Sequence, residues 1–217
     1  MQRLREHLYL IRRYSDARAC DGDNDWAGYF ILYQNSCRYI HDLVSRQKED
    51  ILMSYTTLYK VPKEGEIECY QEFRNAFRGG YLIWDNLANE FLGKGASAFM
   101  LTDMQPIWDL ARQAEIPGAY RITLMTTFDN VMVKRRNIPL LIKAFEKYCA
   151  DFDDPGHIPA QIEALKNVAT EKDCFAVCWT QTSVSGDSWR VPDECDETRT
   201  YDVSRDSGHW FLFEEIF

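Results

Sequence analysis

The sequence lacks any long apolar run, and this excludes a helix that crosses a membrane. Its uninterrupted apolar stretches are short, such as Cys174–Trp179, whereas a bilayer crossing needs about 20 residues. Glycine and proline are also scarce, with 11 and 7 residues among 217, which excludes a fibrous or low-complexity chain. Hydrophobic residues make up 46% and aromatic residues 14%, so intrinsic disorder is excluded too.

The start of the sequence lacks the pattern of a secretory signal. Residues 1–14 interleave charged and apolar side chains, without a continuous apolar centre or a small-residue cleavage site. The seven cysteines are an odd number and are mostly spread singly through apolar stretches, as buried thiols are. We therefore expect a cytoplasmic protein. The alternative is an amphipathic mitochondrial presequence, against which Glu6 and Asp16 count.

Charge is unevenly distributed along the chain. Residues 149–217 carry 15 acidic and 5 basic residues, whereas residues 1–148 are nearly neutral, and the whole chain has a formal charge of −9. An acidic block repels phosphates, so it disfavours nucleic-acid binding. It attracts a basic protein partner and speeds the encounter at low salt. The alternative is that this block only forms a solvated face.

Apolar spacing predicts an α+β protein, with a helical N-terminal half followed by a small, mainly antiparallel sheet and two packed helices. Stripes at spacings of three and four predict helices at residues 4–11, 26–44, 51–59, 67–77, 81–91, 103–114, 137–148 and 158–168. For residues 51–59 a strand is the alternative, because Thr56 and Thr57 are β-branched. Runs rich in β-branched or uncharged residues predict strands at 120–127, 131–133, 174–180 and 210–213, the first two forming a hairpin.

No flexible linker interrupts this pattern, so residues 1–217 are expected to form a single compact domain. A subdivision near Pro117–Gly118 is the alternative boundary. The absence of charge from Cys174–Thr180 indicates a strand buried on both faces.

Two segments resemble ligand-binding motifs but lack residues that those motifs require. Asp21–Asp25 has acids at alternate positions, but Trp26 and Leu32 stand where a calcium loop needs glycine and glutamate. Gly93–Ser97 lacks the frame of a nucleotide-binding loop. The histidines pair with no other histidine or cysteine at a metal-ligand spacing, so we expect no metal site and no cofactor.

Residues 180–210 form the remaining candidate, a long polar segment that combines aromatic side chains with many acids. Such a long loop is uncommon in a compact domain and is often functional or disordered. Aromatic anchors supply buried area and acids supply steering toward a basic surface. The candidate partner-binding residues are Trp189, Asp193, Glu194, Asp196, Glu197, Tyr201, Asp202 and Asp206. The alternative is an acidic loop whose tryptophan lies in the core.

The sequence therefore favours an acidic, cytoplasmic protein-binding protein, of the inhibitor or immunity kind, that engages a basic partner through its C-terminal third. No catalytic motif supports an enzyme. An enzyme whose site is assembled from distant residues is nevertheless the alternative, with His157, Cys178 and His209 as first candidates and with Asp206 orienting His209. A further alternative is a structural subunit that self-associates through an apolar patch.

Overall fold

A five-stranded sheet organises the residues that the computed structural model describes, which are 55–75, 78–93, 104–181, 187–193, 195 and 197–217. These residues all belong to one compact unit, Leu52–Phe217. The helices expected at 4–11 and 26–44, and the Asp21–Asp25 turn, lie outside the described residues.

The sheet is mainly antiparallel, with the strand order β2-β1-β4-β3-β7. Only β3 and β7 run parallel. The strands are β1 (Tyr55–Val61), β2 (Glu68–Arg74), β3 (Val131–Lys134), β4 (Ala176–Thr180) and β7 (Trp210–Phe211). A separate two-stranded sheet is formed by β5 (Arg190–Pro192) and β6 (Thr198–Thr200).

The described helices fall into two groups along the chain, the first between β2 and β3 and the second between β3 and β4. They are α3 (Gly80–Phe91), α4 (Gln105–Asp109), α5 (Gly118–Met125), α6 (Ile138–Asp151) and α7 (Ile158–Val168). Short 3₁₀ turns follow α4 at Leu110–Arg112 and precede α6 at Arg135–Asn137, and a π-helical turn covers Leu212–Ile216. The α+β class expected from the sequence is confirmed.

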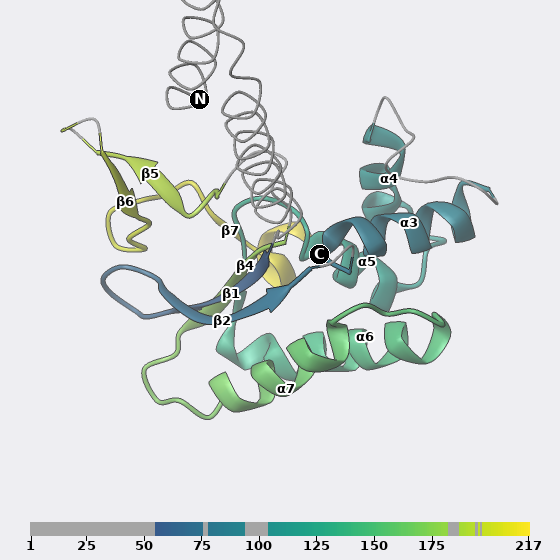
Figure 1. Ribbon diagram of the computed structural model, residues 1–217, viewed down its shortest axis with the longest axis horizontal. Coiled ribbons are helices and arrows are strands. Elements are labelled where there is room, and N and C mark those ends of the chain that lie inside the picture. Colours follow the sequence, from purple (N-terminus) through teal and green to yellow (C-terminus); the bar gives the residue numbers. More distant parts are fainter. Residues whose placement is uncertain (1–54, 76–77, 94–103, 182–186, 194, 196) are drawn as a thin grey trace, which may run out of the picture. The chain divides into compact units, whose positions relative to one another are not determined.

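Each face of the sheet is covered by a different part of the chain. On one face, Leu58, Val133 and Val177 pack with buried residues of the helices. On the other face, Met132 and Cys178 pack with residues of the C-terminal segment. Figure 1 shows α6 and α7 beneath the sheet and the hairpin β5–β6 on its opposite side. Strand β4 is therefore buried on both faces, as its lack of charge predicted.

Several predicted elements are confirmed close to their expected bounds. Helices α3, α6 and α7 match the predicted stripes at 81–91, 137–148 and 158–168. Strands β3 and β4 match 131–133 and 174–180, and β1 matches the strand alternative at 51–59. The helix expected at 103–114 is present as α4 and the 3₁₀ turn after it.

The strand predicted at 120–127 is wrong, because these residues form α5 and the turn that follows it. The hydroxyl of Thr123 donates to the backbone oxygen of Ala119 at 2.9 Å, so this β-branched residue bonds within the helix. Leu124 and Met125 are buried against the other helices. Tertiary packing thus outweighs β-propensity here, and the predicted hairpin loses its first strand.

The helix predicted at 67–77 is also wrong, because Glu68–Arg74 form the strand β2. The pairing of β1 with β2 shifts register between Leu58 and Tyr59, which leaves Tyr70 as an extra residue in β2. A bulge interrupts the alternation of side chains. Tyr70 and Phe73 consequently both pack on the helical side, although three positions separate them, and their spacing imitates that of a helix.

Candidate functional site

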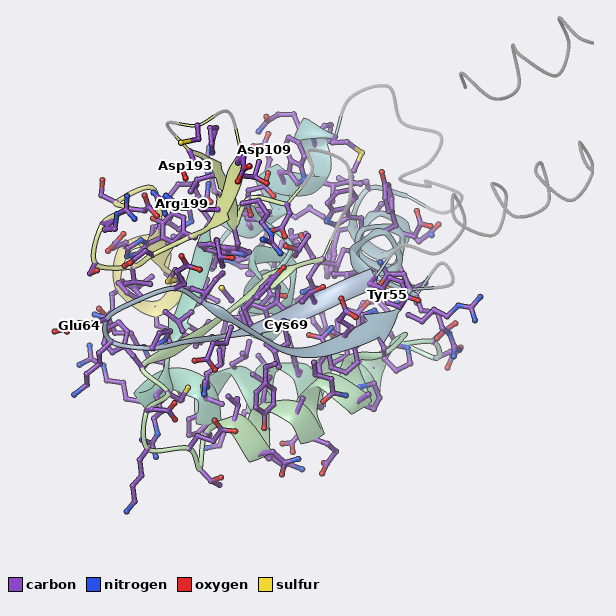
Figure 2. The ribbon with its side chains drawn as sticks, turned by 60° about the vertical axis from the view of Figure 1, so that its left-hand side comes forward. Tyr55, Glu64, Cys69, Asp109, Asp193 and Arg199 are labelled. Atoms are coloured by element: carbon purple, nitrogen blue, oxygen red, sulfur yellow. The ribbon has the colours of Figure 1, made fainter. Side chains whose placement is uncertain are left out.

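The acidic segment singled out in the sequence forms the hairpin β5–β6, in which Arg190 pairs with Thr200 and Pro192 with Thr198. At its tip the amide of Asp193 donates to the backbone oxygen of Glu197 at 2.7 Å. Figure 2 shows Asp193 and Arg199 on this hairpin, on the side of the sheet away from α6 and α7. Residues 190–192 and 198–200 of the long polar segment therefore pair as a hairpin.

Two aromatic residues anchor the base of the hairpin. Trp189 is 0% exposed, and its indole nitrogen donates to the backbone oxygen of Trp179 at 2.9 Å. Tyr201 is 3% exposed, and its ring lies edge-on to that of Trp189 at 5.3 Å. The backbone of Tyr201 extends the pairing, because its amide donates to Trp189 at 2.8 Å and its oxygen accepts from Ile67 at 2.9 Å.

These two rings lie in the core, whereas the sequence analysis predicted that they contact a partner at the surface. The alternation of strand residues explains this position, because the second face of the sheet exposes an apolar surface around Met132 and Cys178 that needs a cover. The rings of Trp189 and Tyr201 supply that cover. They fix the hairpin from below and cannot contact a partner directly.

Asp187 fixes the start of the hairpin. Its carboxylate accepts from the Tyr59 hydroxyl at 2.9 Å, from the Thr180 hydroxyl at 2.9 Å and from the Trp189 amide at 3.0 Å. Burial, followed by the hydrogen bond to Asp187, raises the pKa of Tyr59 far above its usual range. These contacts join β1 and β4 to the hairpin.

Asp202 and Asp206 stabilise the loop that follows β6. The carboxylate of Asp206 accepts two hydrogen bonds from the Arg199 guanidinium, at 2.7 and 2.8 Å, and a third from the Asp202 amide at 2.8 Å. The bond from Arg199 lowers the pKa of Asp206 to about 2. Asp202 in turn accepts from the amide and the hydroxyl of Ser204 at 2.9 and 2.6 Å. Both carboxylates are thus engaged within the chain.

Two of the remaining candidate acids, Asp193 and Glu197, lie at the hairpin tip. Asp193 and Glu197 are exposed, as is Cys195 between them. Glu194 and Asp196 lie outside the described residues. The six candidate residues that the structure describes therefore separate into exposed acids at the tip and residues engaged at the base, a division that depends on the fold and that the sequence did not reveal.

His157 lies in a network of buried polar side chains at one end of the sheet. Its Nε2 is 3.0 Å from Asn75 Oδ1, and its Nδ1 is 3.0 Å from Gln161 Nε2. Because Gln161 donates through its amide nitrogen, Nδ1 accepts and Nε2 carries the proton. Burial, followed by the nearby charge of Arg78, lowers the pKa of His157 to about 4. Both ring nitrogens are occupied, which disfavours a role in proton transfer.

The network extends beyond His157 on both sides. Asn75 accepts from the Thr56 hydroxyl at 2.7 Å, and Gln161 accepts from the Trp179 indole at 3.0 Å. Further along, Gln181 donates to the Thr126 hydroxyl at 2.8 Å. Among the described residues, every fully buried side-chain nitrogen and oxygen has a hydrogen-bond partner. The hydrogen-bonding groups of the network are therefore satisfied, as expected of a network that stabilises the fold.

His209 and Cys178 do not form a catalytic pair with the groups expected from the sequence. Asp206 binds Arg199, and the side chain of His209 instead contacts the Tyr201 hydroxyl, 2.8 Å from Nδ1. Cys178 is 0% exposed, and burial raises the pKa of its thiol well above the usual value. A thiolate nucleophile needs a lowered pKa and access, and Cys178 has neither.

Other side chains also contact groups within the chain. Lys134 and Arg136 both bind Glu214, and the side chain of Arg135 donates to the backbone oxygen of Ala169 at 2.9 Å. Within the described ranges, no group of three or more histidine, cysteine or acidic side chains is arranged to hold a metal ion. In the same part of the chain, no helix has the length and apolar character needed to cross a membrane.

Comparison with known proteins adds no family to this description. No protein-family model, curated protein or solved structure matches the chain.

Proposed function

We propose that this chain is a protein-binding protein, of the inhibitor or immunity kind, whose acidic hairpin tip engages a basic partner. The observation that carries the proposal is the division of the hairpin into an exposed acidic tip and a base anchored in the core. Asp193 and Glu197 are exposed, whereas Trp189 and Tyr201 beneath them are buried. A tip held by a fixed base loses less conformational entropy on binding than a free loop would.

The tip concentrates negative charge. Four of the five residues from Asp193 to Glu197 are acidic. The two arginines of the hairpin contact carboxylates at its base, since Arg199 binds Asp206 and Arg190 lies 3.9 Å from Asp187. Complementary charge speeds the encounter with a basic partner and makes that encounter sensitive to salt.

The cysteines fit the cytoplasmic setting that we infer from the sequence. The five cysteines within the described ranges, Cys69, Cys149, Cys174, Cys178 and Cys195, are all free thiols. Free thiols are typical of a reducing compartment.

The proposal is tested by affinity capture from host lysate at low and at high salt, with bound proteins identified by mass spectrometry. The tip variant carries Asp193→Asn, Glu194→Gln, Asp196→Asn and Glu197→Gln. The control variant neutralises four exposed acids on other elements through Glu64→Gln, Glu90→Gln, Glu115→Gln and Glu146→Gln. Both variants change the net charge equally, so a difference between them reports position and not total charge.

We expect the wild-type and control proteins to retain one basic protein at low salt and to lose it at high salt. The tip variant should fail to retain it at either salt. Equal retention by the tip and control variants would refute the assignment of the tip as the binding site. Absence of any specific partner of the wild type would refute the proposed function.

A further inference from the structure

Strand β2 forms one edge of the five-stranded sheet (Figure 1). It pairs with β1 on one side, and in the part of the chain that the structure describes no strand pairs with its other side. Backbone hydrogen bonds from the described loops reach only residues that flank the strand, such as Ile67 and Asn75. The outward amide and carbonyl groups of such an edge strand can pair with a further strand.

Strand β2 lacks most of the features that keep an edge strand from pairing. Its sequence, Glu68–Arg74, contains neither proline nor lysine, and five of its seven residues are exposed. The bulge at Tyr70 disturbs only the first half, because Gln71–Arg74 pair regularly with Tyr55–Leu58. The second half of β2 is therefore a regular strand with an open edge.

Two opposite charges lie on one face of this regular half. Phe73 packs on the helical side of the sheet, so the side chains of Glu72 and Arg74 point to the other side. Both residues are exposed, and neither forms an ion pair within the described ranges. The regular half of β2 therefore carries an acid and a base, two positions apart, that a second strand can complement.

We propose that the edge of β2 is an interface between two copies of this chain, which pair antiparallel about a two-fold axis at Phe73. Glu72 of each copy then lies opposite Arg74 of the other, so two ion pairs form across the axis. The two five-stranded sheets join into one continuous sheet, with the helices of both copies on the same side. The inference does not depend on the proposed function.

The charges select this register. Residues directly opposite in a continuous antiparallel sheet lie on the same face, so the axis passes through a residue and not between two. An axis at Glu72 or at Arg74 would bring two like charges together. An axis at Gln71 would set the bulged residue Tyr70 opposite Glu72. The axis at Phe73 pairs opposite charges and uses only the regular half of the strand.

The dimer should be weak, for two reasons. The paired segment is short, so the interface is small and association depends on protein concentration. The formal charge of −9 on each chain also opposes association, and salt screens that repulsion together with the two exposed ion pairs. The proposal is therefore tested by comparing variants at one ionic strength, over a wide range of protein concentration.

The measurement is sedimentation equilibrium of the full chain. For the wild type, the average mass should rise with concentration from the 25.5 kDa of one chain toward twice that value. Glu72→Arg and Arg74→Glu each place like charges opposite one another on both sides of the axis. Each single variant should therefore weaken association by about tenfold, although the two change the net charge in opposite directions.

Two further samples restore the opposite charges. The double variant Glu72→Arg, Arg74→Glu exchanges the two residues and should associate like the wild type. An equimolar mixture of the single variants should form mixed dimers, because one copy then presents two arginines and the other two glutamates. Glu146→Arg, on the exposed face of α6, is the control that changes net charge as Glu72→Arg does, and it should leave association near that of the wild type.

A wild type that keeps the mass of one chain at every concentration would overturn the proposal, and the open edge would then belong to another occupant. A dimer that survives both single charge reversals would overturn it equally, because its interface would lie elsewhere. Failure of both the double variant and the mixture to restore association would contradict the axis at Phe73.

Discussion

Trp189 and Trp179 connect the two sides of the sheet through a single strand. The indole nitrogen of Trp189 donates to the backbone oxygen of Trp179 at 2.9 Å from the side of the hairpin. The side chain of Trp179 lies on the opposite side, where its indole donates to Gln161 of α7 at 3.0 Å. The hairpin base and the helical layer are thus both bonded to the same residue of β4.

Replacement of Trp189 by alanine should therefore strongly destabilise the protein. The change removes a fully buried ring and leaves the backbone oxygen of Trp179 without its donor. We expect the free energy of unfolding to fall by about 3–5 kcal/mol, measured by chemical denaturation. Trp189→Phe keeps most of the apolar area but loses the hydrogen bond. Its free energy of unfolding should therefore fall by less, about 1–3 kcal/mol.

The matched control is Trp210→Ala, which removes a tryptophan that is partly exposed on β7. This variant should lose less stability than Trp189→Ala, because Trp210 is already 37% exposed to water in the folded protein, whereas Trp189 is 0% exposed. Equal losses at the two positions would contradict the role of Trp189 as the anchor.

Gly79 should not tolerate a side chain, because Asn75 packs directly against it. A β-carbon at Gly79 would lie 2.6 Å from the Asn75 amide group, which holds both Thr56 and His157. Asn75 would have to move, and its buried partners would lose their hydrogen bonds. Gly79→Ala should therefore lower the free energy of unfolding by about 1–3 kcal/mol.

Gly65 provides the comparison. Its φ of +96° disfavours any side chain, yet nothing lies within 4 Å of a β-carbon built there. Gly65→Ala should therefore lower the free energy of unfolding only through backbone strain, by about 1 kcal/mol. If urea denaturation gives Gly79→Ala the smaller loss, the packing argument for Asn75 is wrong.

A helix or strand can be predicted from the sequence where its buried residues form one continuous face and therefore recur at a regular spacing. In α6, Leu141, Phe145 and Tyr148 are buried, and their spacing of three and four identifies the helix. In β2 the bulge at Tyr70 breaks the alternation, and the pairing with β1 that explains it lies outside the local sequence. In α5, packing against other helices outweighs the β-branched composition.

The candidate site is predicted only in part, for a related reason. The acidity of residues 193–197 is a property of composition and is visible in the sequence. The burial of Trp189 and Tyr201 depends on the uncovered second face of the sheet, which no local pattern describes. The pairing of Arg199 with Asp206 and of Tyr201 with His209 depends on the path of the loop.

The cysteines should differ sharply in their reaction with a maleimide. Cys178 and Cys174 are buried, and burial raises the pKa of the Cys174 thiol to about 11, so neither should be labelled in the native protein. Cys195 at the hairpin tip is exposed and should react. Peptide mass spectrometry after brief labelling measures each site separately. Labelling of Cys178 as fast as that of Cys195 would restore Cys178 as a candidate nucleophile.

His157 should make the stability of the protein depend on pH in the acid range. Its pKa is about 4 in the folded protein, against about 6.5 when unfolded. Between these values the unfolded chain binds more protons, so stability is lost as the pH falls from about 6.5 to about 4 and levels off below that. Because water reaches part of the ring, we expect the loss from this residue to be about 2 kcal/mol.

The comparison of wild type with His157→Gln isolates this contribution from that of the carboxylates. The variant loses hydrogen bonds at every pH, but it has no group to protonate, so its disadvantage should be largest near neutral pH. The difference in unfolding free energy between the two proteins should then shrink by about 2 kcal/mol on going from about pH 7 to about pH 4. A difference that stays constant with pH would mean that His157 titrates normally, and the buried network around Asn75 would then have to admit water.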